Sequence, residues 1–258
     1  MTGTGGADGS DAEPSSVAGA GSPAPPADPT DPTALEALHP LATSEVDVID
    51  VSADRAGLRH REVYTMRGLL SVLAHEPPSG TAPTGSAIVA CGGAMGGVLG
   101  PGRGLYHHLG ERWAARGTPF LRVGYREPNN LDLCAHDLAC GVEMARDAGA
   151  DRVVVMGHSF GGAVAIRAAV VMPASVVGVV TFATQSAGCE VAAALGGRPL
   201  LLFHGDRDEL LPPESSWIVQ AMAGSGEVVV LPGEGHLLAE SDDAITQRLD
   251  DWLAATLT

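Results

Sequence analysis

The chain has 258 residues, of which 45% are hydrophobic, so it can form one large α/β domain or two small ones with a sizeable core. Its formal net charge is −16, and the first 33 residues hold only five of the acids, so the rest still carries 26 acids against 15 bases, or −11. Such a surface repels phosphate backbones and anionic membranes, and we therefore expect neither a nucleic-acid nor a membrane partner.

Residues 1–33 are rich in Gly, Ala, Ser, Pro and Asp and contain almost nothing large and apolar, which predicts a disordered tail. The alternative is a docking segment for a partner, although the tail resembles neither a recognition helix nor a proline-rich ligand. The tail also lacks the basic and apolar regions of a secretory signal. The longest apolar run, 163–183, is interrupted by Arg167 and Pro173. We expect a cytoplasmic protein whose folded domain spans 44–258.

The region after the tail is predicted to begin with a short helix and an antiparallel sheet edge. Residues 35–41 suit the helix. Apolar and polar residues alternate over 45–51 and again over 61–65, and 69–75 can continue that sheet. A loop rich in Pro, Gly and Ser follows at 77–85.

Strands and helices then alternate to the end of the chain. Short apolar, β-branched runs predict buried strands of a parallel sheet at 87–91, 120–123, 153–156, 176–182, 199–203 and 227–231. Helical spacing of apolar residues predicts helices at 103–116, from the cap Asp132 to Gly149, from Gly162 to Met172, after Cys189, at 214–222 and at 239–255. The pattern predicts an α/β fold with a mostly parallel, doubly wound sheet of about eight strands and helices on both faces.

Metal and redox chemistry find little support in the sequence. Its four cysteines, Cys91, Cys134, Cys140 and Cys189, show no metal-ligand spacing. His107 and His108 are adjacent, whereas a metal pair on a helix needs a spacing of four. We expect reduced thiols, no metal and no cofactor.

A catalytic motif stands between the strand at 153–156 and the following helix. Residues 157–161 read GHSFG, and strand, tight turn and helix form the context of a G-x-S-x-G nucleophile elbow centred on Ser159. The chain contains 34 glycines, so the motif by itself is also compatible with an ordinary glycine-rich turn in which Ser159 caps the helix.

Two later strands lead into an acidic and a histidine motif. The strand at 199–203 is followed by HGDRD at 204–208, and the strand at 227–231 is followed by PGEGH at 232–236. Serine, acid and histidine in this order, each after a buried strand, resemble the α/β-hydrolase family. The resemblance covers about residue 46 to the C-terminus and is most similar to small lidless bacterial hydrolases related to dienelactone hydrolases and simple esterases. Dienelactone hydrolases carry Cys at the nucleophile position, whereas this chain has Ser159.

The resemblance implies a catalytic triad of Ser159, His236 and Asp208. Histidine near its ordinary pKa of about 6.5 can take the serine proton, and a carboxylate can hold the imidazole tautomer. The family pattern H-G-x-x-D-x-x-x-P places the acid at Asp208; Asp206 and then Glu190 are the alternatives. Each residue also has a structural interpretation, as a helix cap, a turn former or an ordinary loop histidine.

The oxyanion hole is predicted from the glycine-rich segment 92–97 and the start of the elbow helix. The family usually has His-Gly before the oxyanion residue, and this chain has Cys91-Gly92-Gly93. The resemblance implies one backbone donor at Gly93 or Ala94 and the other at Phe160. A phosphate-binding loop is the alternative, but the segment lacks its glycine spacing and its lysine.

The resemblance also implies which residues meet the substrate, namely Met95, Tyr125, Asn129 and Gln185. After the strand at 120–123 many relatives carry Arg-Gly-x-Gly-x-Ser, and this chain has GYREPNN at 124–130. Fewer than twenty residues separate the strands at 176–182 and 199–203, where relatives commonly insert a lid. We therefore expect a lidless serine hydrolase acting on a small-molecule ester. A thioesterase or peptidase with the same triad and a non-catalytic binding protein are the alternatives, and the oligomeric state is left open.

Overall fold

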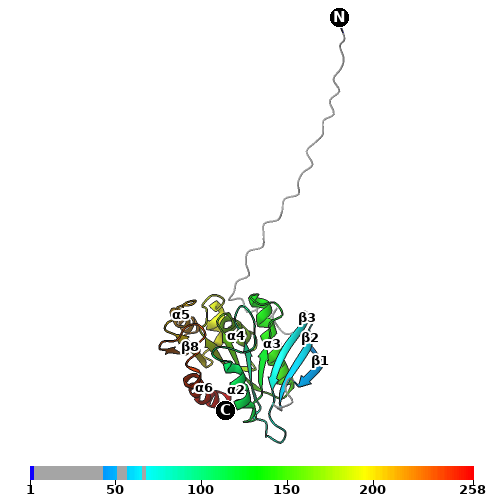
Figure 1. The fold of residues 1–258 in the computed structure, drawn as a ribbon, viewed down its shortest axis with the longest axis vertical. Coiled ribbons are helices and arrows are strands. Elements are labelled where there is room, and N and C mark those ends of the chain that lie inside the picture. The colour runs from blue at the N-terminus through cyan, green and yellow to red at the C-terminus, as the bar shows by residue number, and fades with distance from the viewer. Residues whose placement is uncertain (3–42, 51–56, 66–67) are drawn as a thin grey trace.

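The computed structural model describes residues 1–2, 43–50, 57–65 and 68–258 (Figure 1). Nearly all of the predicted tail and the predicted helix at 35–41 lie outside these residues. The described chain forms one layered α/β domain in which helices cover both faces of a central sheet (Figure 1).

The sheet contains nine of the described strands, one more than the approximate number expected. In chain order they are β1 (Thr43–Asp50), β2 (Leu58–Thr65), β3 (Gly68–His75), β4 (Ser86–Cys91), β5 (Phe120–Val123), β6 (Arg152–His158), β7 (Val176–Phe182), β8 (Leu200–Gly205) and β9 (Glu227–Leu231). Their spatial order is β1-β2-β3-β5-β4-β6-β7-β8-β9. Strands β1, β2 and β3 form the predicted antiparallel edge, β3 is antiparallel to β5, and the strands from β5 to β9 are parallel.

The helices are distributed over the two faces as a doubly wound sheet requires. They are α2 (Leu105–Ala114), α3 (Leu131–Asp147), α4 (Phe160–Val171), the 3-10 helix η1 (Glu190–Leu195), α5 (Glu214–Ala223) and α6 (Asp242–Leu257). Buried residues of α3, α4 and α5 pack on one face of the sheet, and those of α2 and α6 pack on the other. Among the described helices, none combines the length and apolar character needed to cross a bilayer.

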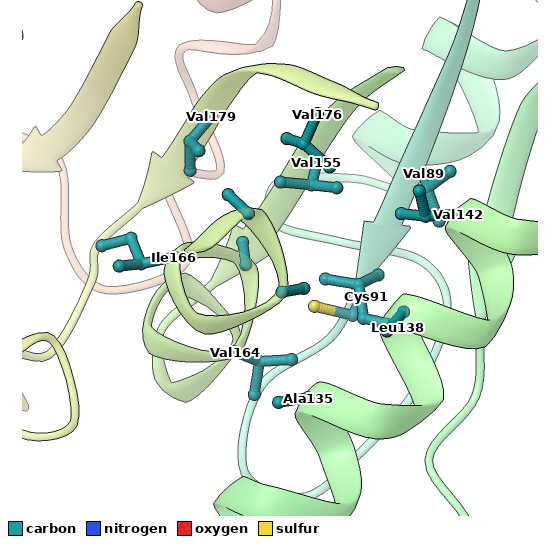
Figure 2. Packing of buried hydrophobic residues seen from close by; sticks show 14 of the residues in the cluster. Val89, Cys91, Ala135, Leu138, Val142, Val155, Val164, Ile166, Val176 and Val179 are labelled. Carbon is teal, nitrogen blue, oxygen red and sulfur yellow. The ribbon is translucent and has the colours of Figure 1, made fainter. Parts of the chain in front are cut away.

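The alternation of side chains along each buried strand explains these two layers. Val89 and Val155 face the layer of α3 and α4 and belong to the same buried cluster as Leu138 of α3 and Val164 of α4 (Figure 2). Their neighbours in the chain, such as Val154, face α2 and α6. Both faces are therefore apolar, which is why the central strands appear in the sequence as continuous hydrophobic runs.

Four helix starts differ from the prediction. Helix α2 begins at Leu105 rather than at residue 103, and α6 begins at Asp242 rather than at residue 239. Helix α3 is capped by Asn130, whose side-chain oxygen accepts a hydrogen bond from Leu133 N–H at 3.3 Å. Asp132, the predicted cap, lies in the first turn and forms an ion pair with Arg167 at 2.9 Å. Helix α4 begins at Phe160, directly after the elbow serine, rather than at Gly162.

The connection between β7 and β8 contains only the short helix η1. It spans residues 183–199, in agreement with the short connection counted in the sequence. No inserted helical layer therefore stands in this connection above the carboxyl ends of the parallel strands.

Candidate active site

The turn between β6 and α4 has the geometry of a nucleophile elbow. Ser159 has φ 57° and ψ −120°, a strained backbone conformation for a residue with a side chain. A Cβ on Gly157 would collide with the carbonyl oxygen of Gly161, so strand and helix close this tightly only because residue 157 is glycine. Ser159 N–H donates to Phe182 O at 2.8 Å, which ties the elbow to β7. The predicted strand, turn and helix are confirmed, and the Ser159 side chain stands at the carboxyl edge of the sheet.

Asp208 and His236 meet at the same edge. The Nδ1 atom of His236 lies 2.8 Å from Asp208 Oδ2. The other oxygen, Oδ1, accepts hydrogen bonds from the N–H groups of Leu210 and Leu211 at 2.9 and 2.8 Å. Burial of the side chain opposes ionisation of Asp208, but the hydrogen bonds from Leu211, His236 and Leu210 outweigh it and hold the pKa below its ordinary value. The group is therefore a carboxylate at neutral pH, oriented toward the imidazole.

The two alternative acids are placed elsewhere. Asp206 is exposed, and its Oδ1 accepts a hydrogen bond from Gly233 N–H at 2.6 Å, which fixes the turn after β9. Glu190 accepts from Gly188 N–H at 3.0 Å at the start of η1. Of the three candidate acids, Asp208 is the one that contacts His236.

His204 supports Asp208 from behind. Its Nε2 lies 3.2 Å from Asp208 Oδ2 and 3.0 Å from Leu211 O, and its Nδ1 lies 2.7 Å from Ser216 Oγ. The ring is fully buried, and this burial lowers the pKa of His204. A neutral imidazole with all of these partners fixes the carboxylate of Asp208 in place.

His158 supports His236 in a similar way. Its Nε2–H donates to the backbone oxygen of His236 at 3.0 Å, and the two ring centroids lie 5.0 Å apart. Burial lowers the pKa of His158 to about 4, so the ring stays neutral at ordinary pH. The loop that carries His236 is therefore tied to the elbow through the residue before Ser159.

Ser159 and His236 share one cleft of about 450 Å³. Its lining consists of Gly92, Gly93, Ala94, Met95, Gly96, Gly97, Val98, Leu99, Gly100, His158, Ser159, Leu210, His236 and Leu237. Among the described residues, no hydrogen bond joins the Ser159 hydroxyl to the His236 imidazole. Such bonds are often long without a substrate and shorten when one binds.

Residues 92–97, which we call the glycine loop, pass directly over the elbow. A Cβ on Gly93 would lie 3.6 Å from Ser159 Cβ, so the backbone of Gly93 and Ala94 borders the nucleophile. Phe160 is the first residue of α4, where backbone N–H groups lack partners within the helix. The three predicted oxyanion residues are therefore gathered around Ser159.

The predicted substrate-lining residues are only partly brought together. Met95 lines the cleft, at the exposed tip of the glycine loop. The lining of the cleft does not include Tyr125, Asn129 or Gln185. The Tyr125 hydroxyl donates a hydrogen bond to the backbone of the glycine loop, Asn129 is exposed, and Gln185 Nε2 donates to the backbone oxygen of Ala187 at 2.8 Å. The cleft is lined in their place by three leucines that were not predicted, Leu99, Leu210 and Leu237.

The α/β-hydrolase fold is defined by a parallel sheet with an antiparallel edge, a strained serine between a strand and a helix, and an acid and a histidine after later strands. The protein has this fold. No family model matches the sequence, and no curated protein matches it. Solved structures that share the fold include XC6422 from Xanthomonas campestris, described as a serine hydrolase without lid, with 18% identity and a TM-score of 0.60 over 76% of this chain and 95% of that one.

Two other solved structures are similar to the same extent. A serine hydrolase homologue from Coxiella burnetii has 18% identity and a TM-score of 0.62 over 79% of this chain and 100% of that one. Est1E from Butyrivibrio proteoclasticus has 17% identity and a TM-score of 0.60 over 83% and 99% of the two chains. At these identities the similarity describes the fold.

Proposed function

We propose that the protein is a serine hydrolase that cleaves small carboxylic esters through an acyl-enzyme. The observation that carries this proposal is the arrangement of three side chains. Ser159 stands on a strained elbow and shares a cleft with His236, whose Nδ1 is hydrogen-bonded to the buried carboxylate of Asp208 at 2.8 Å. This is the constellation that activates a serine hydroxyl at neutral pH.

The reaction follows from the positions of these groups. Ser159 Oγ attacks the ester carbonyl carbon while Nε2 of His236 accepts the hydroxyl proton, and the carbonyl oxygen becomes an oxyanion. Backbone N–H groups of Gly93 or Ala94 and of Phe160 stabilise that charge. His236 then gives the proton to the leaving alcohol, and a water molecule, activated by the same imidazole, hydrolyses the acyl-enzyme. Asp208 holds the tautomer and stabilises the imidazolium throughout.

The rim of the cleft favours an uncharged, partly apolar substrate. Four of its large side chains are exposed, with Met95 94%, Leu99 61%, Leu210 69% and Leu237 59% accessible. No Asp, Glu or Arg lines this cleft among the described residues. A phosphate-bearing thioester therefore finds no cation there, and the negative net charge of the chain repels it further. These features favour a neutral ester over such a thioester.

The size of the cleft limits how much of the substrate it can hold. Each further buried methylene contributes about 0.8 kcal/mol while it still has wall to touch. No lid stands between β7 and β8 to extend that wall. Gains in kcat/KM should therefore stop after a few carbons. The description of XC6422 as a lidless serine hydrolase is in line with this proposal.

A series of p-nitrophenyl esters from acetate to dodecanoate tests the proposal, with Ser159→Ala as the matched control. We expect hydrolysis of the acetate and butyrate, little further gain with longer chains, and no rate increase when the substrate forms micelles. A clear preference for the longest chains with activation at the oil–water interface would contradict the small-ester assignment. Turnover of thioesters or peptides without turnover of any ester would favour the alternative classes.

A further inference from the structure

The cleft opens toward the face of the sheet that α2 and α6 cover. Its wall at residues 98–100 leads toward α2, and its wall at 236–237 leads toward α6. Gly102 N–H donates to Leu237 O at 2.6 Å, which joins the segments that carry these two walls. The next residue, Leu238, is fully buried in the cluster between the sheet and the two helices. The fold therefore holds both walls in place on this side of the nucleophile.

The opposite side, toward α3 and η1, is closed. Of the described residues, none in 124–130 or 183–188, the loops that follow β5 and β7, lines the cleft. Tyr125 packs against the buried cluster of α3 and α4, with its ring edge-on to Phe160 and the centroids 6.1 Å apart. A Cβ on Gly161 would lie 3.2 Å from Tyr125 Oη, so the tyrosine already occupies the space beside the elbow helix.

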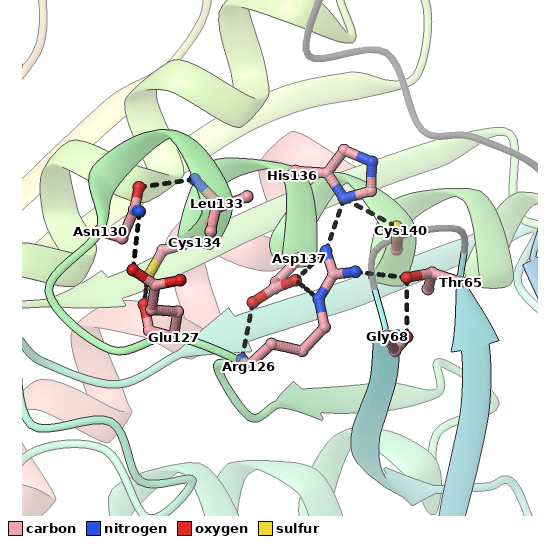
Figure 3. A network of polar contacts seen from close by, with 10 residues as sticks. All are labelled: Thr65, Gly68, Arg126, Glu127, Asn130, Leu133, Cys134, His136, Asp137 and Cys140. Carbon is pink, nitrogen blue, oxygen red and sulfur yellow. Dashed lines mark hydrogen bonds and ion pairs between the residues drawn. The ribbon is translucent and has the colours of Figure 1, made fainter.

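A buried ion pair holds the loop after β5 on that side. Asp137 of α3 accepts from the Arg126 backbone N–H at 2.9 Å and from its Nε at 2.5 Å (Figure 3). The same guanidinium contacts His136 Nδ1 at 2.8 Å and the hydroxyl of Thr65 (Figure 3). At the other end of the loop, Asn130 caps α3. The loop is therefore anchored at both ends, which keeps it away from the cleft.

The chemistry of acylation assigns the two halves of an ester to these two sides. His236 Nδ1 is bonded to Asp208, so the proton taken from Ser159 is carried on Nε2. Nε2 then gives this proton to the oxygen of the departing alcohol, which must lie next to His236. The acyl group is bonded to the same carbon and projects in another direction, toward the side that Tyr125 and Phe160 fill. The alcohol therefore enters the cleft, and the acyl group meets the closed side.

Apolar side chains surround the place where the alcohol would lie. Leu237 directly follows the base, and Leu210 follows the acid by two positions, where its N–H donates to Asp208 Oδ1 at 2.9 Å. Both leucines line the cleft and are more than half exposed. Met95 and Leu99 line it from the side of the glycine loop. An aliphatic alcohol bound here would remove apolar surface from water on both sides of the cleft.

We propose that this cleft is a leaving-group site, and that the substrates are esters of small acids with longer, apolar aliphatic alcohols. The inference rests on the proposed serine hydrolase function and deepens it, because it names the half of the ester that the protein selects. It makes Leu210 and Leu237 specificity-determining residues for the alcohol. It also places Tyr125 on the acyl side, which accounts for its absence from the cleft.

Two isomeric esters test the assignment. Hexyl acetate and ethyl hexanoate contain the same atoms and differ in which half carries the long chain. After each value is divided by the rate constant for alkaline hydrolysis of the same ester, kcat/KM for hexyl acetate should exceed that for ethyl hexanoate by about tenfold or more. Equal values, or a preference for ethyl hexanoate, would overturn the inference and leave the proposed function intact. A wild type that hydrolyses no ester would contradict the proposed function, and the inference with it.

Leu237→Ala and Ile218→Ala form a matched pair of variants. Each removes an exposed apolar side chain, and only Leu237 lines the cleft. Leu237→Ala should lower the ratio of kcat/KM for hexyl acetate over ethyl hexanoate by about three- to tenfold, because the alcohol loses part of its wall. Ile218→Ala should keep the ratio of the wild type. Leu210→Ala repeats the test from the second wall, and wild-type ratios in both leucine variants would overturn the inference.

Capture of the acyl-enzyme by added alcohol provides a second readout. A site that releases the alcohol also binds it in the reverse direction, in place of water. During hydrolysis of p-nitrophenyl acetate, the oxygen of 1-hexanol should attack the acetyl carbon, its proton should pass through His236 to Ser159 Oγ, and the bond from the acetyl carbon to Oγ should break to release hexyl acetate. At equal concentrations, hexanol should capture about tenfold more acetyl groups than ethanol. Equal capture of the two alcohols would contradict the leaving-group site.

Discussion

Two hollows lie at opposite ends of the parallel strands. The cleft at the carboxyl ends has about 450 Å³, and a cavity of about 320 Å³ lies at the amino ends, bordered by Ser86 of β4 and by Pro119 and Ala150 just before β5 and β6. Their sizes are similar, and both are largely apolar in lining. Volume alone therefore does not distinguish a candidate active site from a gap in the packing.

The polar groups in the two hollows differ in what they face. In the amino-end cavity Glu76 is paired with Arg59 at 2.8 Å and with Arg61, and Ser86 donates to Leu257 O at 3.1 Å. Those groups neutralise one another within the fold. At the carboxyl end, by contrast, a buried carboxylate and two buried histidines support Ser159 and His236, which open to the cleft. Convergence of supported polar groups, rather than size, is what makes the carboxyl end the candidate site.

The largest expected effect comes from the two groups that open to the cleft. Ser159→Ala and His236→Ala should each lower ester turnover by about 10³-fold or more, because the serine and its base act as a unit. The melting temperature should stay within a few degrees, since neither side chain is part of the apolar core. Steady-state kinetics and thermal unfolding of the same samples provide the check. Either variant keeping a tenth of wild-type activity would remove that residue from the mechanism.

The next effect separates the two aspartates after β8. Asp208→Asn should lose about 10³-fold or more in kcat, since an amide N–H at this position opposes the tautomer that donates from His236 Nδ1. Asp206→Asn should stay within a few-fold, because its carboxylate holds only the turn at Gly233. Comparable activity in both variants and wild type would contradict the assignment of Asp208 as the acid.

A third prediction concerns acid stability at the carboxyl end. Burial lowers the pKa of His158 from its ordinary 6.5 to about 4, although the hydrogen bond to the His236 carbonyl and the charge of Asp208 oppose this shift. Between pH 6.5 and about pH 4, His158 is protonated in the unfolded chain but neutral in the folded chain. The contribution of His158 to the free energy of unfolding is therefore complete above pH 6.5 and is lost progressively as the pH falls toward 4. The contribution lost between pH 8 and pH 5 is about 2 kcal/mol.

His158→Gln removes this titration and keeps an N–H donor for the His236 carbonyl. Urea unfolding at pH 8 and pH 5 should therefore show a smaller loss of stability for the variant than for the wild type, by about 2 kcal/mol. The same pH dependence in both proteins would show that His158 is not held neutral by its surroundings.

The smallest effect is expected at the amino end. Glu76→Gln weakens partly exposed ion pairs with Arg59 and Arg61, which typically contribute no more than about 1 kcal/mol. The kcat/KM for a short ester should remain that of the wild type. A loss of activity without a loss of stability would mean that the amino-end cavity is coupled to the reaction, and the contrast between the two hollows would fail.

The sequence predicts those parts of the structure that leave a local pattern. The buried strands, the elbow at Ser159 and the order of Asp208 and His236 all follow from short stretches of adjacent residues. The β7 strand was predicted with its observed bounds, because a short apolar run rich in β-branched residues is typical of a buried strand. The cap of α3 was misplaced, because Asn130 and Asp132 are both suitable caps and only the backbone geometry selects between them.

Contacts between segments that are far apart in the chain leave no such local pattern in the sequence. Nothing local to Tyr125 indicates that its hydroxyl meets the Gly92 carbonyl, 33 residues away. The apolar rim of the cleft left a weak signal in the sequence, because Leu210 and Leu237 follow the motif residues Asp208 and His236 by two positions and one position. Large apolar residues beside catalytic motifs are therefore worth considering as cleft walls.

Labelling with a fluorophosphonate tests the central claim most directly, because the reagent forms a covalent bond only with an activated serine. Intact wild type, Ser159→Ala and Asp208→Asn would be treated in parallel, and the adduct located by mass spectrometry of peptides. We expect one phosphonyl group per wild-type chain, on Ser159, none on Ser159→Ala, and much slower labelling of Asp208→Asn. An unlabelled wild type, or equal labelling of wild type and Ser159→Ala, would contradict the assignment of Ser159 as an activated nucleophile.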